Sequence, residues 1–347
     1  LWLSNYGEKL TSHSGILELM DDLSEALTRP DVLMLGGGNP GYIPAIQEVW
    51  QRRMRETLED ETAFHRMLGH YSAPQGRPGF GQAVAECLNE AYGWDLTGEN
   101  VAVTNGSQQA FFHLLNMFAG EGPDGVRRRI LFPLCPEYIG YADQGIDHDH
   151  FVSCRPRIAL EGEHGFKYHI DFDQLPLDET IGAICVSRPT NPTSNVLTDV
   201  EVEHLERLAD GHGIPLIVDN AYGEPFPGIV FREVRPPWSP NTILVFSLSK
   251  LGLPGSRTGI VVGAPEVVKA LSAVNAIANL ANGNLGQTLV EPMLRSGELL
   301  ELCRTVIRPF YREKLDQARG WIGEAFGERF PYRVHRSEGA FFLWLWF

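Results

Sequence analysis

Short apolar runs alternate with segments of helical periodicity along the middle of the chain. Runs typical of buried strands lie at 101–104, 129–132, 181–186, 214–218, 242–247 and 259–262. Apolar residues recur at helical spacing in 108–118, 138–143 and 199–212. Strands that alternate with helices usually form a parallel sheet covered on both faces. The pattern therefore predicts an α/β fold with three layers, in which helices cover both faces of a mostly parallel sheet.

The two ends of the chain carry a different pattern. Helices are expected over 16–27 and through much of 264–326, and strands at 333–335 and 341–347. We therefore predict a large α/β domain over 45–270 and a smaller α+β domain built from 1–44 and 271–347. The apolar run 341–347 is expected to form a buried strand with Trp344 and Trp346 in the core, so the natural polypeptide is expected to continue past it.

Composition and charge restrict the classes of function. The 347 residues include 29 lysines and arginines and 44 aspartates and glutamates, which gives a net charge of −15. This acidity argues against a nucleic-acid partner, because such a partner needs a basic surface. No apolar run approaches the roughly 18 residues of a membrane span, so no membrane partner is expected. Five cysteines without a C-x-x-C motif predict reduced thiols and a cytoplasmic location.

Polar residues that could take part in binding or catalysis follow two of the predicted strands. Gly106 and Ser107 lead from a strand into a helix whose free N–H groups suit a phosphate, although Gly-Ser is also an ordinary way to begin a helix. Asn191 lies between Pro189 and Pro192, which fix its backbone and aim its amide, although asparagine is also common in turns. Because ligands of open α/β sheets bind at the carboxyl ends of strands, both segments are candidate sites.

Two further strand ends carry charged residues. Asp219 leaves an apolar strand and needs a charged or hydrogen-bonding partner, and the alternative is a helix cap. Lys250 follows the strand at 242–247, and a site between that strand and a glycine turn is expected to lower its pKa and make it a nucleophile. Ser247 and Ser249 lie on one face of the strand, and with Arg257 they could clamp a phosphate.

One ligand would use all four strand ends. Pyridoxal phosphate offers an aldehyde for Lys250, a phosphate for the clamp, a ring nitrogen for Asp219 and a phenolic oxygen for Asn191 and Tyr222. We therefore predict this cofactor. The sequence D-H-D-H at 147–150 could suggest a metal, but its short spacing without a distant third ligand favours a solvated loop, and no metal site is predicted.

Several segments resemble the class I/II aminotransferases of the aspartate-aminotransferase fold, which is fold type I of the pyridoxal-phosphate enzymes. They are SLSKLGLPGSRTGI (247–260), SRPTNPTSN (187–195) and VDNAYGEPF (218–226). Within this family, further blocks are most similar to members that transfer an amino group between valine and pyruvate. These blocks are LMLGGGNPGYIP (33–44), TNGSQQAFFHLLNMFAG (104–120), FPLCPEYIGYAD (132–143) and EGAFFLWLWF (338–347).

The resemblance implies roles at the matching positions. Lys250, Asp219 and Tyr222 would be catalytic, with Lys250 bound to the cofactor aldehyde and Asp219 paired with the ring nitrogen. Asn191 and Tyr222 would bind the phenolic oxygen. The phosphate would be held by Gly106, Ser107, Gln108, Ser247 and Arg257.

The resemblance also implies contacts beyond the cofactor's own strand ends. Tyr138 would stack on the cofactor ring. Tyr71, in HYSAPQG, would reach the phosphate of a neighbouring subunit, which implies a homodimer with shared active sites. Gly38 and Asn191 would lie near the substrate carboxylate. The substrates would be a small aliphatic amino acid and a 2-oxo acid, used in turn in a ping-pong reaction.

Two positions depart from the family pattern. Ser194 stands where such motifs usually have glycine, which is expected to change a turn but not the chemistry. The arginine that binds the substrate carboxylate in this family is expected beyond Phe347. An aminotransferase of other specificity and a carbon–sulfur β-lyase of the same fold are alternatives, because the cofactor motifs barely distinguish them. A cofactor-sensing regulator would need an added helix-turn-helix domain and a basic surface, which the sequence does not contain.

Overall fold

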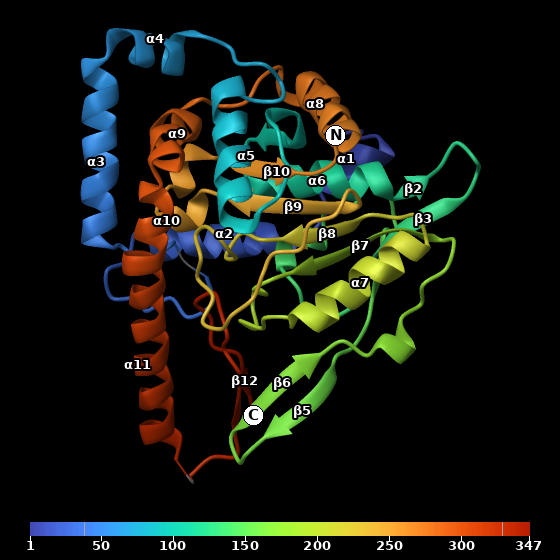
Figure 1. The fold of residues 1–347 in the computed structure, drawn as a ribbon. Coiled ribbons are helices and arrows are strands. Elements are labelled where there is room, and N and C mark those ends of the chain that lie inside the picture. Colours follow the sequence, from blue (N-terminus) through green and yellow to red (C-terminus); the bar gives the residue numbers. More distant parts are fainter. Residues whose placement is uncertain (38, 328) are drawn as a thin grey trace.

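A large central sheet packed between helices dominates the fold (Figure 1). The computed structural model describes residues 1–37, 39–327 and 329–347. The sheet order is β1 (Val101–Thr104), β10 (Gly259–Val262), β9 (Thr242–Ser247), β8 (Leu216–Asp219), β7 (Ile181–Ser187), β3 (Arg127–Phe132) and β2 (Gly120–Glu121), and β4 (Phe151–Ser153) also pairs with β3. Strands β4, β3, β7, β8 and β9 pair in parallel, whereas β10 is antiparallel to both of its neighbours. The predicted α/β class is confirmed.

Helices cover both faces of this sheet because the strands are apolar on both sides. Along β9, Ile243 and Val245 pack with α6 (Ser107–Phe118) and α8 (Pro265–Asn279). Leu244 and Phe246 point to the opposite face, which packs with α5 (Pro78–Tyr92) and α7 (Asp199–Gly211). This alternation follows from the two-residue period of a strand. The continuous apolar runs therefore mark buried strands, as the sequence predicts.

A second sheet forms the lower part of the molecule in Figure 1. Its order is β12 (Leu345–Trp346), β11 (Arg333–His335), β6 (Gly165–His169) and β5 (Arg157–Glu161). The long helix α11 (Arg308–Phe326) extends beside it. This sheet takes β5 and β6 from inside the range 45–270, and the division of the chain at 45 and 270 stays a prediction.

The remaining helices come from both ends of the chain. They are α1 (Asn5–Leu10), α2 (Gly15–Ala26), α3 (Pro44–Glu59), α4 (Glu61–Gly69), α9 (Leu285–Ser296) and α10 (Glu298–Leu302), with a π-helical turn over Cys303–Ile307 between α10 and α11. Among the described residues, none of these helices combines the length and the hydropathy that a membrane crossing needs.

Two local predictions are wrong, and a third is only partly right. The helix expected at 138–143 is only a 3₁₀ turn, Ile139–Tyr141, because Tyr138 is extended and Gly140 favours helix poorly. Of the run 341–347, only β12 is a strand, and Trp346 is 47% exposed. The loop 147–150 is not wholly solvated, because His150 is buried with its Nε2 atom 3.1 Å from the carbonyl oxygen of Leu115.

Candidate active site

The register of the central sheet brings the carboxyl ends of three strands together. Ser187 of β7 is paired with Asp219 of β8, and Asp219 is paired with Val245 of β9. The chain then turns through the 3₁₀ turn Ser249–Leu251, which carries Lys250. Ligand sites of open α/β sheets form at such strand ends, so these residues define the candidate site.

Lys250 lies against a pair of aromatic rings. Its Nζ atom is 5.1 Å from the ring centre of Tyr222 and 5.7 Å from that of Phe341. Burial lowers the pKa of Lys250 to about 8, an effect that Asp219 opposes and Arg257 reinforces. An amine with this pKa is partly neutral near physiological pH, so it can attack a carbonyl carbon or accept a proton.

Asp219 presents a buried carboxylate close to Lys250. Its Oδ1 atom accepts the N–H of Ala221 at 2.9 Å, and its Oδ2 atom accepts the hydroxyl of Tyr141. Burial raises the pKa of Asp219, whereas Tyr141, Ala221 and Lys250 act to lower it. A carboxylate in such a place favours a positively charged N–H partner. Tyr141 is not among the predicted site residues, and only its spacing from Tyr138 could have suggested it.

Positive charge gathers at the beginning of α6. The guanidinium of Arg257 lies so close to Gly106 that a Cβ at position 106 would be 2.1 Å from its Nη2 atom. The φ of Gly106 is +91°, which also requires glycine. Ser107 begins α6, where N–H groups lack intrahelical partners and the helix dipole favours negative charge. Guanidinium and helix end therefore converge, as the sequence predicts.

A cavity of about 330 Å³ lies beside this helix end. It is lined by Asn105, Gln108, Gln109, Phe112, Gln144 and Arg257. The side chain of Gln108 donates to the carbonyl of Gly140 at 3.3 Å. Ser247 is buried, and its hydroxyl oxygen accepts the N–H of Ser249 at 3.2 Å, which leaves its hydroxyl hydrogen able to donate. Gln108 and Arg257 thus border one cavity, whereas Ser249 lies in the 3₁₀ turn after β9 and not on the strand face that the sequence had predicted.

The predicted ligands of the ring are also brought together. Burial raises the pKa of Tyr222 well above its usual value, and a hydrogen bond with the side chain of Asn191 acts in the opposite direction. Burial and the charge of Asp219 raise the pKa of Tyr138, and Arg257 lowers it. Tyr138 therefore lies within electrostatic reach of both the buried carboxylate and the anion site.

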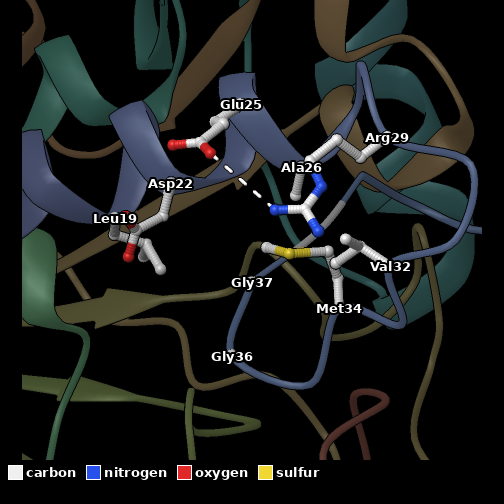
Figure 2. A pocket seen from close by; sticks show the side chains of 9 residues that line it. All are labelled: Leu19, Asp22, Glu25, Ala26, Arg29, Val32, Met34, Gly36 and Gly37. Carbon is white, nitrogen blue, oxygen red and sulfur yellow. Dashed lines mark ion pairs between the residues drawn. The ribbon is translucent and has the colours of Figure 1, made fainter.

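Two predicted residues are not part of this cluster. Tyr71 is 84% exposed and lies in the loop after α4, and Gly38 lies outside the described residues. A separate cavity of about 350 Å³ lies between α2 and residues 32–37 (Figure 2). Among residues 1–37, 39–327 and 329–347, its lining includes Leu19 and the ion pair of Glu25 with Arg29, but none of the predicted site residues.

Glu137 is a second residue that the sequence did not single out. Its carboxylate accepts the N–H of Ser187 at 2.9 Å and also the Ser187 hydroxyl. Burial raises the pKa of Glu137 to about 8. Glu137 thereby joins the segment that carries Tyr138 to the end of β7, four residues before Asn191. An acidic residue inside the apolar stretch 130–141 was the only signal in the sequence.

Comparison with known proteins decides the family. The family model described as aminotransferase class I and II matches residues 30–346. The chain belongs to the class I and II aminotransferases. Over 344 residues it is 49% identical to the valine–pyruvate aminotransferase of Escherichia coli K12, with 99% of this chain and 82% of that protein covered.

Solved structures of similar proteins have the same fold. A putative amino-acid aminotransferase of Psychrobacter arcticum superposes with a TM-score of 0.96 at 43% identity, over 100% of this chain and 83% of that one. The valine–pyruvate aminotransferase of Salmonella typhimurium gives 0.86 at 48% identity, over 96% and 82%. An aspartate aminotransferase of Thermus thermophilus, at 23% identity, gives 0.79 over 99% and 84%, a likeness of fold alone.

The geometry of this aminotransferase fits pyridoxal phosphate, the cofactor of the family. Lys250 offers an amine of lowered pKa to an aldehyde. Asp219 offers a buried carboxylate to a protonated ring nitrogen. The surface at Gly106 and Arg257 is closed to a Cβ and carries the positive charge that a phosphate requires. The described residues thus match the three functional ends of the cofactor.

Proposed function

We propose that this aminotransferase moves an amino group between valine and pyruvate, giving 3-methyl-2-oxobutanoate and alanine. The identity of 49% to a valine–pyruvate aminotransferase supports this choice of substrates. The aromatic surroundings of Lys250 support an aliphatic side chain, because Tyr222 and Phe341 offer it an apolar surface. The alternatives are an aminotransferase of other specificity and a carbon–sulfur β-lyase.

The residues of the site divide the work of the reaction. When bound, pyridoxal phosphate supplies an electron sink for the carbanion that forms at the substrate Cα. Lys250 would hold the cofactor aldehyde and would also be the base that takes the proton from the substrate Cα. Its pKa of about 8 suits both tasks. Asp219 would keep the ring nitrogen protonated, and Asn191 and Tyr222 would hold the phenolic oxygen.

The remaining proposed contacts fix the cofactor in place. Tyr138 would stack on the ring, and the phosphate would be held by Gly106, Ser107, Gln108, Ser247, Ser249 and Arg257. Because one substrate must leave before the other binds, the kinetics are ping-pong. Gly38 is proposed beside the substrate carboxylate with Asn191.

The observation that carries this proposal is Lys250, which lies against two rings and close to Asp219. Lys250→Ala in the full-length protein should abolish the visible absorbance of bound cofactor and nearly all alanine formation from L-valine and pyruvate. Lys269→Ala, at an exposed lysine of α8, is the matched control. Wild-type turnover in Lys250→Ala would refute the proposal. Ammonia release from L-cystathionine, without alanine formation from valine, would favour the β-lyase.

We also propose a homodimer whose active sites are shared. Hydrogen bonds from Asn282 to the carbonyl of Pro74 and from Asn284 to the carbonyl of His70 join the loop after α4 to residues 282–284. Exposed apolar side chains gather on the flanking segments, namely Leu68, Tyr71, Ile277 and Leu280. The adjacent Gly283 donates to Asn105, beside the anion site, at 3.0 Å. In a twofold dimer, this surface would meet its own copy and bring Tyr71 to the partner's phosphate.

Mixed dimers test this sharing directly. Tyr71→Phe and Lys250→Ala are each expected to reduce activity when purified alone. A heterodimer of the two variants would contain one site with both changes and one site with neither. Random reassembly of equal amounts should therefore recover about a quarter of wild-type activity, since half of the dimers would each have one intact site. No recovery, or a monomer by light scattering, would contradict the proposal.

The proposed location is the cytoplasm. All five cysteines are free, as expected in a reducing compartment. Fractionation of the native cells with an antibody to the protein would test this location.

A further inference from the structure

Ser194 has an unusual backbone conformation for its residue type. It is fully buried, and its φ is +57°, in the left-handed region that glycine adopts most easily. It lies three residues after Asn191. A backbone outlier of this kind at a residue other than glycine motivates a hypothesis about the function of its side chain.

The side chain of Ser194 holds both backbone groups of one distant residue. Its hydroxyl donates to the carbonyl of Phe342 at 2.8 Å and accepts the N–H of Phe342 at 3.0 Å. The carbonyl of Ser194 also accepts the N–H of Glu338 at 3.0 Å. A hydroxyl can donate and accept at once, whereas neither glycine nor alanine offers such a group.

The segment held in this way carries two rings to the active site. Phe341 and Phe342 pack edge-on against Tyr222, with ring centres 5.2 and 5.5 Å away. Phe341 also stacks on Tyr311 at 4.6 Å. The hydroxyl of Tyr311 accepts the N–H of Gly41 at 2.9 Å, which ties the segment before α3 to the same wall.

The position of Phe341 relative to Lys250 indicates which of these rings would face the substrate. The proton that Lys250 removes is on the substrate Cα, so Cα must lie within hydrogen-bond reach of the Nζ atom. A ring centred 5.7 Å from this nitrogen is therefore within reach of a group attached to Cα. Tyr222 is already assigned to the cofactor, which leaves Phe341 to face the substrate.

We infer that Ser194 is a positioning residue, whose hydroxyl fixes the backbone of Phe342 and thereby sets the ring of Phe341 against the aliphatic side chain of the substrate. This inference rests on the proposed function. Asn191 and Ser194 belong to one turn, so a cofactor ligand and the substrate wall are held in fixed relation. The serine is accordingly part of substrate selection, and its role is not limited to the turn.

The alternative is that Ser194 only stabilises the fold. Replacing it with glycine distinguishes this role from the positioning of Phe341. Ser194→Gly removes the hydroxyl and relieves the backbone conformation, whereas Ser194→Ala removes the hydroxyl and keeps the conformation. Ala340→Gly is the matched control, because Ala340 is buried in the same segment with a φ of +54° and has no polar side-chain group to lose. Phe341→Leu tests the wall itself.

The decisive measurement is the ratio of kcat/KM for L-valine to kcat/KM for L-alanine as amino donors, in the full-length enzyme loaded with cofactor. Each extra carbon of valine that is buried is worth about fourfold, so two carbons set a ceiling of about 15-fold on the ratio. Ser194→Gly and Ser194→Ala should both lower this ratio five- to tenfold, mainly through the KM for valine. Cofactor affinity, followed by absorbance, should stay within about threefold.

Thermal unfolding supplies the second measurement. Ser194→Gly should unfold at a higher temperature than Ser194→Ala, although both variants lower the ratio of kcat/KM for valine to kcat/KM for alanine by the same factor. Ala340→Gly should keep the wild-type ratio. Phe341→Leu should lower the ratio, and adding Ser194→Gly should lower it little further. A wild-type ratio in Ser194→Gly, or a ratio that follows unfolding temperature across the variants, would overturn the inference.

The two proposals fail in different ways. If the wild-type enzyme binds cofactor but forms no alanine from valine and pyruvate, the proposed function is wrong and the inference falls with it. If the wild type is active and Ser194→Gly keeps its ratio, only the inference is wrong.

Discussion

Replacing Lys250 by methionine should stabilise the cofactor-free protein at neutral pH. The fall of the Lys250 pKa from 10.5 to about 8 means that the folded protein binds this proton less tightly than the unfolded chain does. At about 1.4 kcal/mol for each unit of pKa, burying the charged amine costs roughly 3 kcal/mol of unfolding free energy at pH 7. Methionine has a similar length and no charge, so Lys250→Met should recover most of this cost.

The pH dependence gives the sign of the effect. Above pH 10.5, Lys250 is neutral in both the folded and the unfolded state, so it does not reduce the unfolding free energy. As the pH falls from 10.5 through about 8, the unfolded chain binds the proton more tightly and this stability is lost. The advantage of Lys250→Met should therefore shrink from roughly 3 kcal/mol at pH 7 to roughly 1 kcal/mol at pH 9.5.

Urea unfolding of the cofactor-free proteins at these two pH values measures the difference. Lys269→Met, on the exposed face of α8, should show no such trend. A Lys250→Met protein that is no more stable than wild type at pH 7, or one whose advantage does not change with pH, would refute the reasoning. The lysine would then be paired or hydrated in solution, and its proposed low pKa would need another cause.

Three further changes test the surroundings of Lys250. Gly106→Ala should raise the dissociation constant of the cofactor at least tenfold by absorbance titration, because its Cβ would collide with Arg257. Tyr141→Phe removes a donor that lowers the pKa of Asp219, so the acid limb of the kcat profile should move to higher pH. Glu137→Gln should gain stability relative to wild type as the pH rises from 5 to 8, by up to about 4 kcal/mol in urea unfolding, because burial raises the pKa of Glu137 to about 8.

Conservative changes elsewhere serve as controls for these three variants. Gly211→Ala adds a Cβ in open space and should leave cofactor affinity unchanged. Tyr6→Phe and Glu163→Gln alter exposed side chains and should shift neither the kcat profile nor the pH dependence of stability. An unchanged dissociation constant in Gly106→Ala, an unmoved acid limb in Tyr141→Phe or a pH-independent difference in Glu137→Gln would contradict the respective prediction.

The sequence predicted the parts of the site that lie at the ends of strands. Lys250 and Asp219 follow apolar runs, and parallel pairing of these runs is enough to bring their ends together. Gly106 was found in the same way, because it follows a predicted strand and leads into a predicted helix. In each case a local pattern and one rule of sheet topology carried the prediction.

The residues that sequence reasoning missed act through pairs that are distant along the chain. Tyr141 and Asp219 are 78 residues apart, and Ser194 and Phe342 are 148 apart. Nothing in the local pattern around either partner specifies the other. The incorrect strand at 341–347 has the same cause, because an apolar run does not reveal whether its backbone pairs with a strand or with a side chain such as that of Ser194.

The hairpin of β9 and β10 carries both a covalent attachment point and an ionic one. Leu248 donates to the carbonyl of Thr258 at 3.1 Å and closes the loop that contains Lys250 and Arg257. With the proposed cofactor bound, Arg257 and the beginning of α6 would hold its phosphate whether or not Lys250 held its aldehyde. Rebinding to Lys250 would then be intramolecular, at an effective concentration on the order of millimolar or more, independent of free cofactor in solution. A closed hairpin would thus let one amine serve as tether and as proton carrier, without loss of the cofactor between turnovers.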